Sequence, residues 1–207
     1  MIDRNEDHID ALADSVDNYL IKLSSHVPPG HGNDLLNYYI QCFSEFERIG
    51  DYAVNLTENA EELRGKSLAF SAAAAREYDV LAAAIGEILD LSLRAFERQD
   101  VAIAELVEPL EQVIDTLKEQ MRTRHILRMQ QGHCSIEAGF VWSDLLTNLE
   151  RTSDHCSNIA GCVIDAAQHN LNLHETLRAA HSDTHAFRSE FERYAAKYAL
   201  PAPASAQ

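Results

Sequence analysis

The amino-acid sequence contains two motifs that each occur twice, and in the same order. Residues 6–12 read E-x-x-I-D-x-L and recur as residues 111–117, at an offset of 105 positions. Residues 47–55 read E-R-x-x-D-x-x-x-N and recur as residues 150–158, at an offset of 103 positions. Two ordered matches at nearly one offset indicate a tandem duplication, because periodic self-similarity is the signature of repeated structural units. The chain is therefore expected to fold as two copies of one unit.

Turn-forming residues and apolar periodicity predict six helices, several of them long. The turn-forming residues interrupt the chain at five places, residues 28–32, 65–67, 98–100, 132 and 170–172. Between these breaks apolar residues recur at helical spacing, and no stretch alternates as a strand does. Pro109 is expected to kink the fourth helix or to mark its true start. The prediction is an all-α fold with one three-helix bundle in residues 1–100, a second in residues 101–200, and a disordered tail at 201–207.

Charge and composition exclude several classes of protein. The chain has 33 Asp and Glu against 17 Lys and Arg, a formal net charge of −16, which argues against binding a nucleic-acid backbone. No apolar run approaches the roughly 20 residues of a membrane helix, and the acidic N-terminus lacks the features of a secretion signal. The four cysteines form no C-x-x-C pair and are expected to be reduced and mostly buried. These features predict a soluble cytoplasmic protein.

Each repeated motif contains two acidic side chains four residues apart. This spacing puts both carboxylates on one face of a helix, and adjacent helices can bring two such pairs together in each bundle. Sites made only of oxygen ligands suit magnesium, manganese or ferrous iron. The candidate metal ligands are Glu6, Asp10, Glu47, Asp51, Glu111, Asp115, Glu150 and Asp154.

A structural ion-pair network is the alternative explanation of the same acidic residues. Arg48 and Arg151 directly follow the motif glutamates and lie three residues before the matching aspartates, close enough to neutralise them without a metal. Asn55 and Asn158 follow the aspartates by one helical turn. Their amides can act as neutral ligands or, in the more common role of such groups, hydrogen-bond across the helix interface. Spacing alone does not separate the two explanations.

Motifs typical of enzymes are missing from the sequence. No Glu-x-x-His occurs, although di-iron bundles of the ferritin type draw their ligands from that motif. No glycine-rich phosphate loop and no G-x-S-x-G nucleophile motif occurs either. We therefore expect a protein without catalytic activity, in which a bound metal serves structure or regulation. The alternative is a carboxylate-liganded metalloenzyme or metal-storage protein built in a helical bundle.

The repeated motifs resemble the PhoU family, and the resemblance covers about residues 5–200. Within that family the chain is most similar to the C-terminal PhoU-like cytoplasmic domain of bacterial Na/Pi cotransporters, through residues 125–134, 144–151 and 197–200. The resemblance implies two antiparallel three-helix bundles side by side, related by a pseudo-two-fold. Because some family members hold iron or zinc clusters on E/D-x-x-x-D motifs, it also implies that the eight acidic residues are metal ligands.

The resemblance also implies a function and a set of partners. Members of the family regulate phosphate uptake by contacting a transporter or a sensor kinase. The expected partner is thus a phosphate transporter, which includes the possibility of the chain's own transmembrane domain, or a sensor kinase. Such contacts place the chain in the cytoplasm, at the inner face of the membrane. A second copy of the chain is a further candidate partner.

Overall fold

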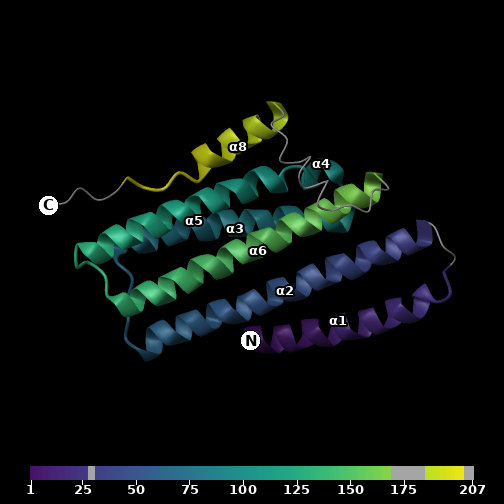
Figure 1. The fold of residues 1–207 in the computed structure, drawn as a ribbon, viewed down its shortest axis with the longest axis horizontal. Helices are drawn as coiled ribbons and strands as arrows, with labels where there is room; N and C mark the ends of the chain where they lie inside the picture. Colours follow the sequence, from purple (N-terminus) through teal and green to yellow (C-terminus); the bar gives the residue numbers. More distant parts are fainter. Residues whose placement is uncertain (28–30, 169–184, 203–207) are drawn as a thin grey trace.

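Within the described residues, the protein is entirely helical. The computed structural model describes residues 1–27, 31–168 and 185–202, and this part of the chain contains no strand. The helices (Figure 1) are α1 (Ile2–Ser24), α2 (His31–Gly65), α3 (Ala72–Arg98), α4 (Val101–Ala104), α5 (Val107–Gln130), α6 (Ile136–Gln168) and α8 (His185–Lys197). The predicted all-α fold is confirmed.

Local sequence explains where the helices begin. Ser71 precedes α3, and its Oγ accepts a hydrogen bond from the backbone N–H of Ala74 at 3.2 Å. Asp100 caps the short α4 in the same way. Pro109 is the third residue of α5, a first-turn position where a missing N–H costs no helical hydrogen bond. The predicted fourth helix thus divides into α4 and α5, and Pro109 does mark the start of its main part.

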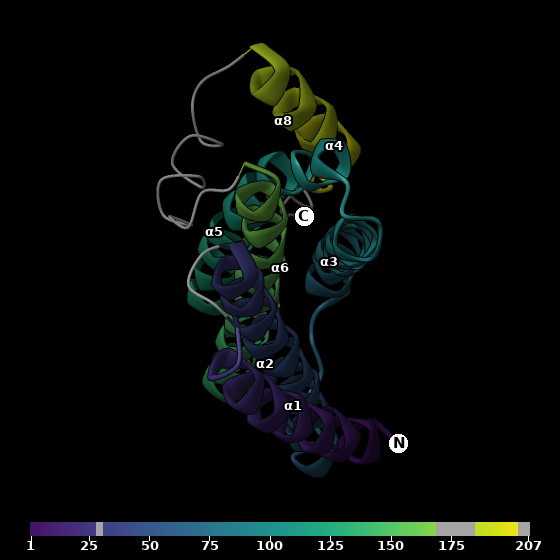
Figure 2. The same ribbon diagram turned by 90° about the vertical axis from the view of Figure 1, so that its right-hand side faces the viewer.

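Helix α6 lies at the centre of the fold, where it packs against α2, α3 and α5 (Figures 1 and 2). Helix α3 also packs against α5, and α8 packs against α5 from the outside. Helix α1 packs against α2 and forms an outer edge of the molecule. Helix α3, which belongs to the first repeat, therefore packs against helices of the second repeat. The division of the chain into two bundles at residue 100 stays a prediction drawn from the sequence repeat.

The contact between α2 and α6 reflects the duplication seen in the sequence. Tyr52 and His155 occupy the same position of the repeated motif, five residues after Glu47 and Glu150 respectively. Their rings stack with centroids 5.5 Å apart and planes 25° apart. When a two-fold axis relates two helices, equivalent residues of the two helices meet at the axis. This contact therefore marks a local pseudo-two-fold between the two halves of the chain.

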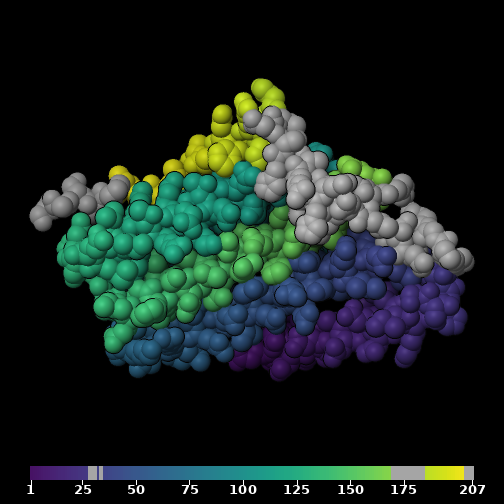
Figure 3. Space-filling view, viewed as in Figure 1, coloured from purple at the N-terminus to yellow at the C-terminus, as the bar shows by residue number. Residues whose placement is uncertain are grey.

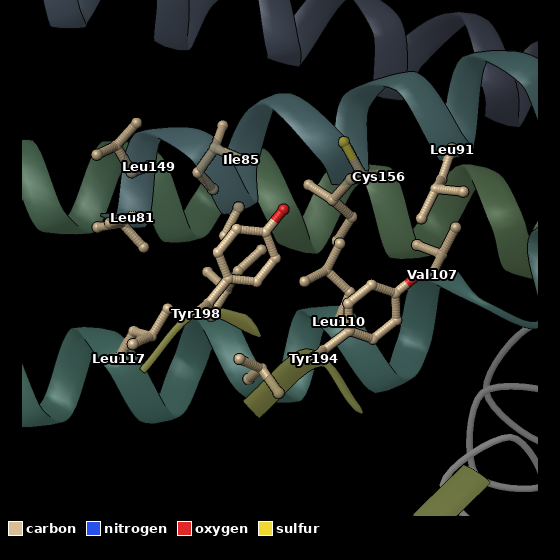
Figure 4. Packing of buried hydrophobic residues seen from close by; sticks show 14 of the residues in the cluster. Leu81, Ile85, Leu91, Val107, Leu110, Leu117, Leu149, Cys156, Tyr194 and Tyr198 are labelled. Atoms are coloured by element: carbon tan, nitrogen blue, oxygen red, sulfur yellow. The ribbon is translucent and has the colours of Figure 1, made fainter. Parts of the chain in front are cut away.

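The main hydrophobic core lies between α3, α5 and α6 and extends under α8. Leu81 of α3 and Leu110 of α5 are fully buried in it, and Leu149 and Cys156 reach it from α6 (Figure 4). Tyr194 and Tyr198 enter the same core from the C-terminal segment. Burial of each large apolar side chain contributes about 1.5–3 kcal/mol, so this cluster is the main source of stability.

Helix α1 is packed much less completely than the others. Its only buried residue is Leu20, while the side chains of Leu12, Tyr19 and Ile21 are 66%, 63% and 64% exposed. The helix runs along one edge of the molecular surface, beside α2 (Figure 3). The predicted helical spacing of its apolar residues is confirmed, but the described residues do not cover that apolar face. None of the described helices combines the length and the apolar character of a membrane span.

The chain remains ordered a little beyond α8. The guanidinium of Arg124 donates a hydrogen bond to the carbonyl oxygen of Pro201 at 2.6 Å. The same arginine, with Arg128, pairs with the buried carboxylate of Glu77, at 3.3 Å and 2.8 Å. This network joins α3, α5 and the start of the C-terminal tail. Residues 203–207, the rest of the tail predicted to be disordered, lie outside the described residues.

Candidate metal centres

The fold brings six of the eight candidate ligands into two clusters at equivalent positions of the repeat. Each residue of a cluster offers one carboxylate oxygen within 4.8 Å of the oxygens offered by the other two. The first cluster contains Glu6, Asp10 and Asp51, and the second contains Glu111, Asp115 and Asp154. Each cluster therefore has three carboxylates close enough to share one cation.

Each cluster forms at the contact between two antiparallel helices. In the second cluster, Glu111 and Asp115 lie one turn apart on α5, and Asp154 approaches from α6. In the first cluster, Glu6 and Asp10 lie one turn apart on α1, and α2 supplies Asp51. The helical spacing recognised in the sequence thus produces the same arrangement twice.

The remaining two candidates, Glu47 and Glu150, lie beside the clusters rather than within them. Glu150 pairs with Lys118 of α5, with Nζ 2.7 Å from Oε1. Within the described residues Glu47 forms no ion pair with a lysine, and its pKa is raised by desolvation and by the nearby carboxylates of Asp51 and Asp10. The sequence analysis did not identify Lys118 as a partner of the motif glutamate, although Lys118 lies three residues after Asp115 and thus on the same helix face.

The second cluster is the more buried, and its electrostatics are strongly unfavourable for three ionised carboxylates. Burial, followed by the repulsion of the Glu108, Asp115 and Asp154 carboxylates, raises the pKa of Glu111 to about 9. Desolvation and the neighbouring Glu150 raise the pKa of Asp154 to about 6. Desolvation, followed by Glu150, also raises the pKa of Asp115. A bound cation would remove this repulsion and displace protons.

The first cluster is more accessible to solvent. Desolvation and the neighbouring carboxylate of Asp10 raise the pKa of Glu6. The Oδ1 atom of Asp10 is shielded from solvent and has no hydrogen-bond donor within the described residues. A shielded carboxylate oxygen without a donor is an unsatisfied acceptor, and a metal ion is one kind of partner that satisfies it. The donor set in this cluster therefore fits a cation.

The arginines of the motif do little to neutralise the two clusters. Arg151 approaches Asp154 only at 3.5 Å, and its side chain is half exposed. Because the pKa of Asp154 is still raised to about 6, this contact does not offset the surrounding negative charge. In the part of the chain that the structure describes, Arg48 forms no ion pair with Asp51. The two motif arginines therefore do not by themselves neutralise the clusters, and metal binding stays a prediction.

The two asparagines of the motif lie in different environments. Asn158 donates a hydrogen bond from Nδ2 to Glu45 Oε2 at 3.0 Å, which is the interface role expected for a buried amide. His155 donates to the same oxygen from Nδ1 at 2.6 Å, so three residues link α2 to α6. The side chain of Asn55 makes no hydrogen bond among the described residues. Glu45 and His155 were missed because neither belongs to the repeated acidic pattern.

Two proteins of known description are similar to this chain in sequence. The chain is 27% identical over 139 residues to a protein of Thermotoga maritima named phosphate-specific transport system accessory protein PhoU homolog 1, covering 67% of this chain and 59% of that protein. A PhoU homolog of the same description from Deinococcus radiodurans is 26% identical over 141 residues, covering 67% of this chain and 63% of that protein. The chain thus matches about three fifths of the length of these relatives.

Solved structures agree with these matches at the level of the fold. The crystal structure of PhoU from Pseudomonas aeruginosa superposes with a TM-score of 0.76 at 21% identity, covering 82% of this chain and 80% of that one. PhoU from Streptococcus pneumoniae, a phosphate transport system regulatory protein, superposes with a TM-score of 0.71 at 18% identity, covering 82% and 79%. The sequence pattern of the PhoU domain matches residues 1–60 and 79–163, which include all four repeated motifs. The chain belongs to the PhoU family.

Proposed function

We propose that the chain is a regulatory module of phosphate transport that acts by contact with other proteins and not by catalysis. Support comes from its membership of the PhoU family and from two relatives named as accessory proteins of phosphate-specific transport systems. The observation that carries the proposal is the occurrence of matching carboxylate clusters in both halves of a PhoU domain. Because the chain spans about three fifths of those relatives, its partners are part of the proposal.

Metal binding at the two carboxylate clusters is the second element of the proposal. Three converging carboxylates suit a hard or borderline divalent cation, so manganese, magnesium, ferrous iron and zinc are the candidate ions. Glu6, Asp10 and Asp51 would hold one ion, and Glu111, Asp115 and Asp154 a second. The bound ion supplies positive charge that holds two helices together and offsets like-charge repulsion. Such an ion serves structure and regulation rather than a reaction.

The partner is a phosphate transporter or a sensor kinase, at the inner face of the membrane. The similarity to the C-terminal domain of Na/Pi cotransporters adds one specific form of this proposal, in which the transporter is the chain's own transmembrane domain. A second copy of the chain is a further partner to test. Co-purification from cells with the chain expressed at its natural level distinguishes these cases. A separate transporter, a kinase or a second copy is captured as another protein, whereas a transmembrane domain of the chain's own is found in the same, longer polypeptide.

Elemental analysis of the metal content tests the carboxylate sites directly. Protein purified without a chelator or a histidine tag is compared with the double variant Asp51→Asn/Asp154→Asn. We expect bound iron, zinc or manganese in the wild type and a reduced content in the variant. The matched control is Asp79→Asn/Asp144→Asn, which removes two exposed aspartates outside the clusters and is expected to keep the metal.

Three results would contradict these proposals separately. Equal metal content in the wild type and in the folded double variant would place the ion outside the clusters. Turnover in an oxidase or phosphatase assay of metal-loaded protein, lost on Asp51→Asn, would instead identify a metalloenzyme. Regulation is tested by phosphate uptake in cells that lack the chain. Unchanged uptake in those cells, under both phosphate-rich and phosphate-poor conditions, would contradict the regulatory function.

A further inference from the structure

A second type of donor cluster lies where α5 turns into α6, away from the carboxylates. Helix α5 ends in a Schellman motif. The N–H of His133 donates to the carbonyl oxygen of Arg128 at 2.9 Å, and the N–H of Gly132 donates to that of Met129 at 3.0 Å. Gly132 has the positive φ of 72° that this motif requires. The turn therefore holds Cys134 in a fixed position next to the end of α5.

Two sulfur atoms and one imidazole nitrogen lie near this turn. His125 and Met129 lie one turn apart on the same face of α5, and Cys134 Sγ is 3.8 Å from His125 Nε2. Gly139 of α6 provides the space for them. A Cβ atom at that position would stand 2.8 Å from Met129 Sδ and 3.1 Å from His125 Nε2, so only glycine leaves both donors where they are.

Among the described residues, the buried imidazole of His125 has a hydrogen-bond partner at only one of its two nitrogens, the Cys134 thiol at Nε2. Its side chain is 4% exposed and stacks on Trp142, with ring centroids 5.7 Å apart. Nδ1 has no partner among the described residues, and the neighbour of Nε2 is the thiol of Cys134. Desolvation and the nearby Arg128 lower the pKa of His125, which favours the neutral imidazole, and Nε2 is the nitrogen that faces the Cys134 thiol. A buried imidazole in this state calls for an explanation.

We propose that His125, Met129 and Cys134 form a binding site for a soft monovalent cation, with copper(I) as the physiological ion. Metal–nitrogen and metal–sulfur bonds of about 2.0 and 2.3 Å at trigonal or tetrahedral angles separate the two ligand atoms by about 3.5–3.7 Å. The Nε2–Sγ separation of 3.8 Å therefore accommodates an ion with little movement. Thiolate ligands suit both copper(I) and zinc, and the thioether of Met129 favours copper(I), whereas magnesium and manganese prefer carboxylates.

The ion has both a route to the site and a defined proton balance. A groove of about 430 Å³ is lined by His125, Met129 and Gly139 and opens to solvent between α5 and α6. Copper enters as copper(I) and leaves as copper(I), so no electron is transferred. The Cys134 thiol loses its proton to solvent when the sulfur–copper bond forms. Because desolvation raises the pKa of this thiol, binding becomes tighter as the pH rises.

An anaerobic titration of the full chain with copper(I), in competition with a chromophoric copper(I) chelator, tests this site. The wild type is expected to bind one equivalent and to release one proton. Cys134→Ser is expected to weaken the affinity at least tenfold, and Met129→Leu by a smaller factor. The control Met121→Leu alters a buried methionine elsewhere on α5 and is expected to bind as the wild type does. Silver(I) provides a redox-inert repeat of the same titration.

The outcomes also separate this site from other thiols and from the carboxylate clusters. Full binding by Cys134→Ser, with loss of binding in the double variant Cys42→Ala/Cys162→Ala, would place the ion at other cysteines and overturn the proposal. The proposal would also be overturned if the wild-type protein failed to take copper(I) from the chelator. Asp51→Asn/Asp154→Asn is expected to keep copper(I) binding. The two metal proposals can therefore fail independently, and circular dichroism verifies the fold of every variant.

Discussion

Replacing Glu111 by glutamine should stabilise the metal-free protein, and increasingly so as the pH rises. Glu111 has a pKa of about 9 in the folded protein, against 4.5 as its ordinary value, chiefly because it is buried. The unfolded chain therefore releases this proton at a lower pH than the folded protein does. Between these two values folding takes up a proton, so the free energy of unfolding falls as the pH rises.

The size of the effect follows from the same two values. Each pH unit between them costs about 1.4 kcal/mol, so from about pH 5 to about pH 8 the wild type loses about 4 kcal/mol if Glu111 titrates alone. Glutamine keeps the shape of the protonated side chain and has no proton to lose. The Glu111→Gln variant is therefore expected to lose little stability over the same range.

Urea unfolding at several pH values, in the presence of a chelator, measures this difference. The control Glu119→Gln changes an exposed carboxylate on the same helix and should follow the pH dependence of the wild type. If Glu111→Gln and the wild type lose stability in parallel between pH 5 and pH 8, Glu111 is ionised in the folded protein, and the electrostatic argument for the second cluster is wrong.

Three further predictions concern packing and ion pairs, and equilibrium unfolding measures each of them. Leu81→Ala, in the fully buried core, should cost about 2–5 kcal/mol, whereas Leu12→Ala on exposed α1 should stay within about 0.5 kcal/mol, and similar costs would refute the assigned core. Glu77→Gln should cost about 3–5 kcal/mol because it leaves Arg128 buried without its counter-ion, and a loss below 1 kcal/mol would contradict this. Desolvation raises the pKa of Glu45, but hydrogen bonds from α6 outweigh it and hold the pKa below its ordinary value. Glu45→Gln should therefore cost about 1–3 kcal/mol near neutral pH and less as the pH falls below about 4.5, and a loss that grows on acidification would refute this.

Much of the fold could be predicted because local rules decide helix starts and ends. Ser71 and Asp100 are efficient N-caps, and the first turn is the helical position where Pro109 costs least, so these boundaries follow from neighbouring residues alone. The partner of each helix is a different problem. The apolar stripe of α3 indicates that it packs, but the choice of α5 and α6 depends on the combined shape of surfaces far apart in the sequence.

The sequence predicts which residues form the clusters, but not how buried or how charged their surroundings are. The i, i+4 spacing of Glu111 and Asp115 requires only a helix, and the repeat identified Asp154 as the third member of the cluster. Spacing contains no information on burial, which sets the pKa of Glu111 and so the difference between the two clusters. The pairing of Lys118 with Glu150 joins two helices and depends on their register.

The incomplete packing of α1 has a consequence for hydrogen exchange. A helix that contacts mainly one neighbour can open with a small free-energy cost while the rest of the protein stays folded, so α1 amides should exchange long before those of α3 or α6. Glu6 and Asp10 lie on that helix, and an ion bridging them to Asp51 would have to hold it closed. Part of the binding energy of such an ion would be used to suppress local opening, so the first cluster would bind it more weakly than a rigid site with the same ligands. The second cluster, set between α5 and α6, has no comparable opening to suppress.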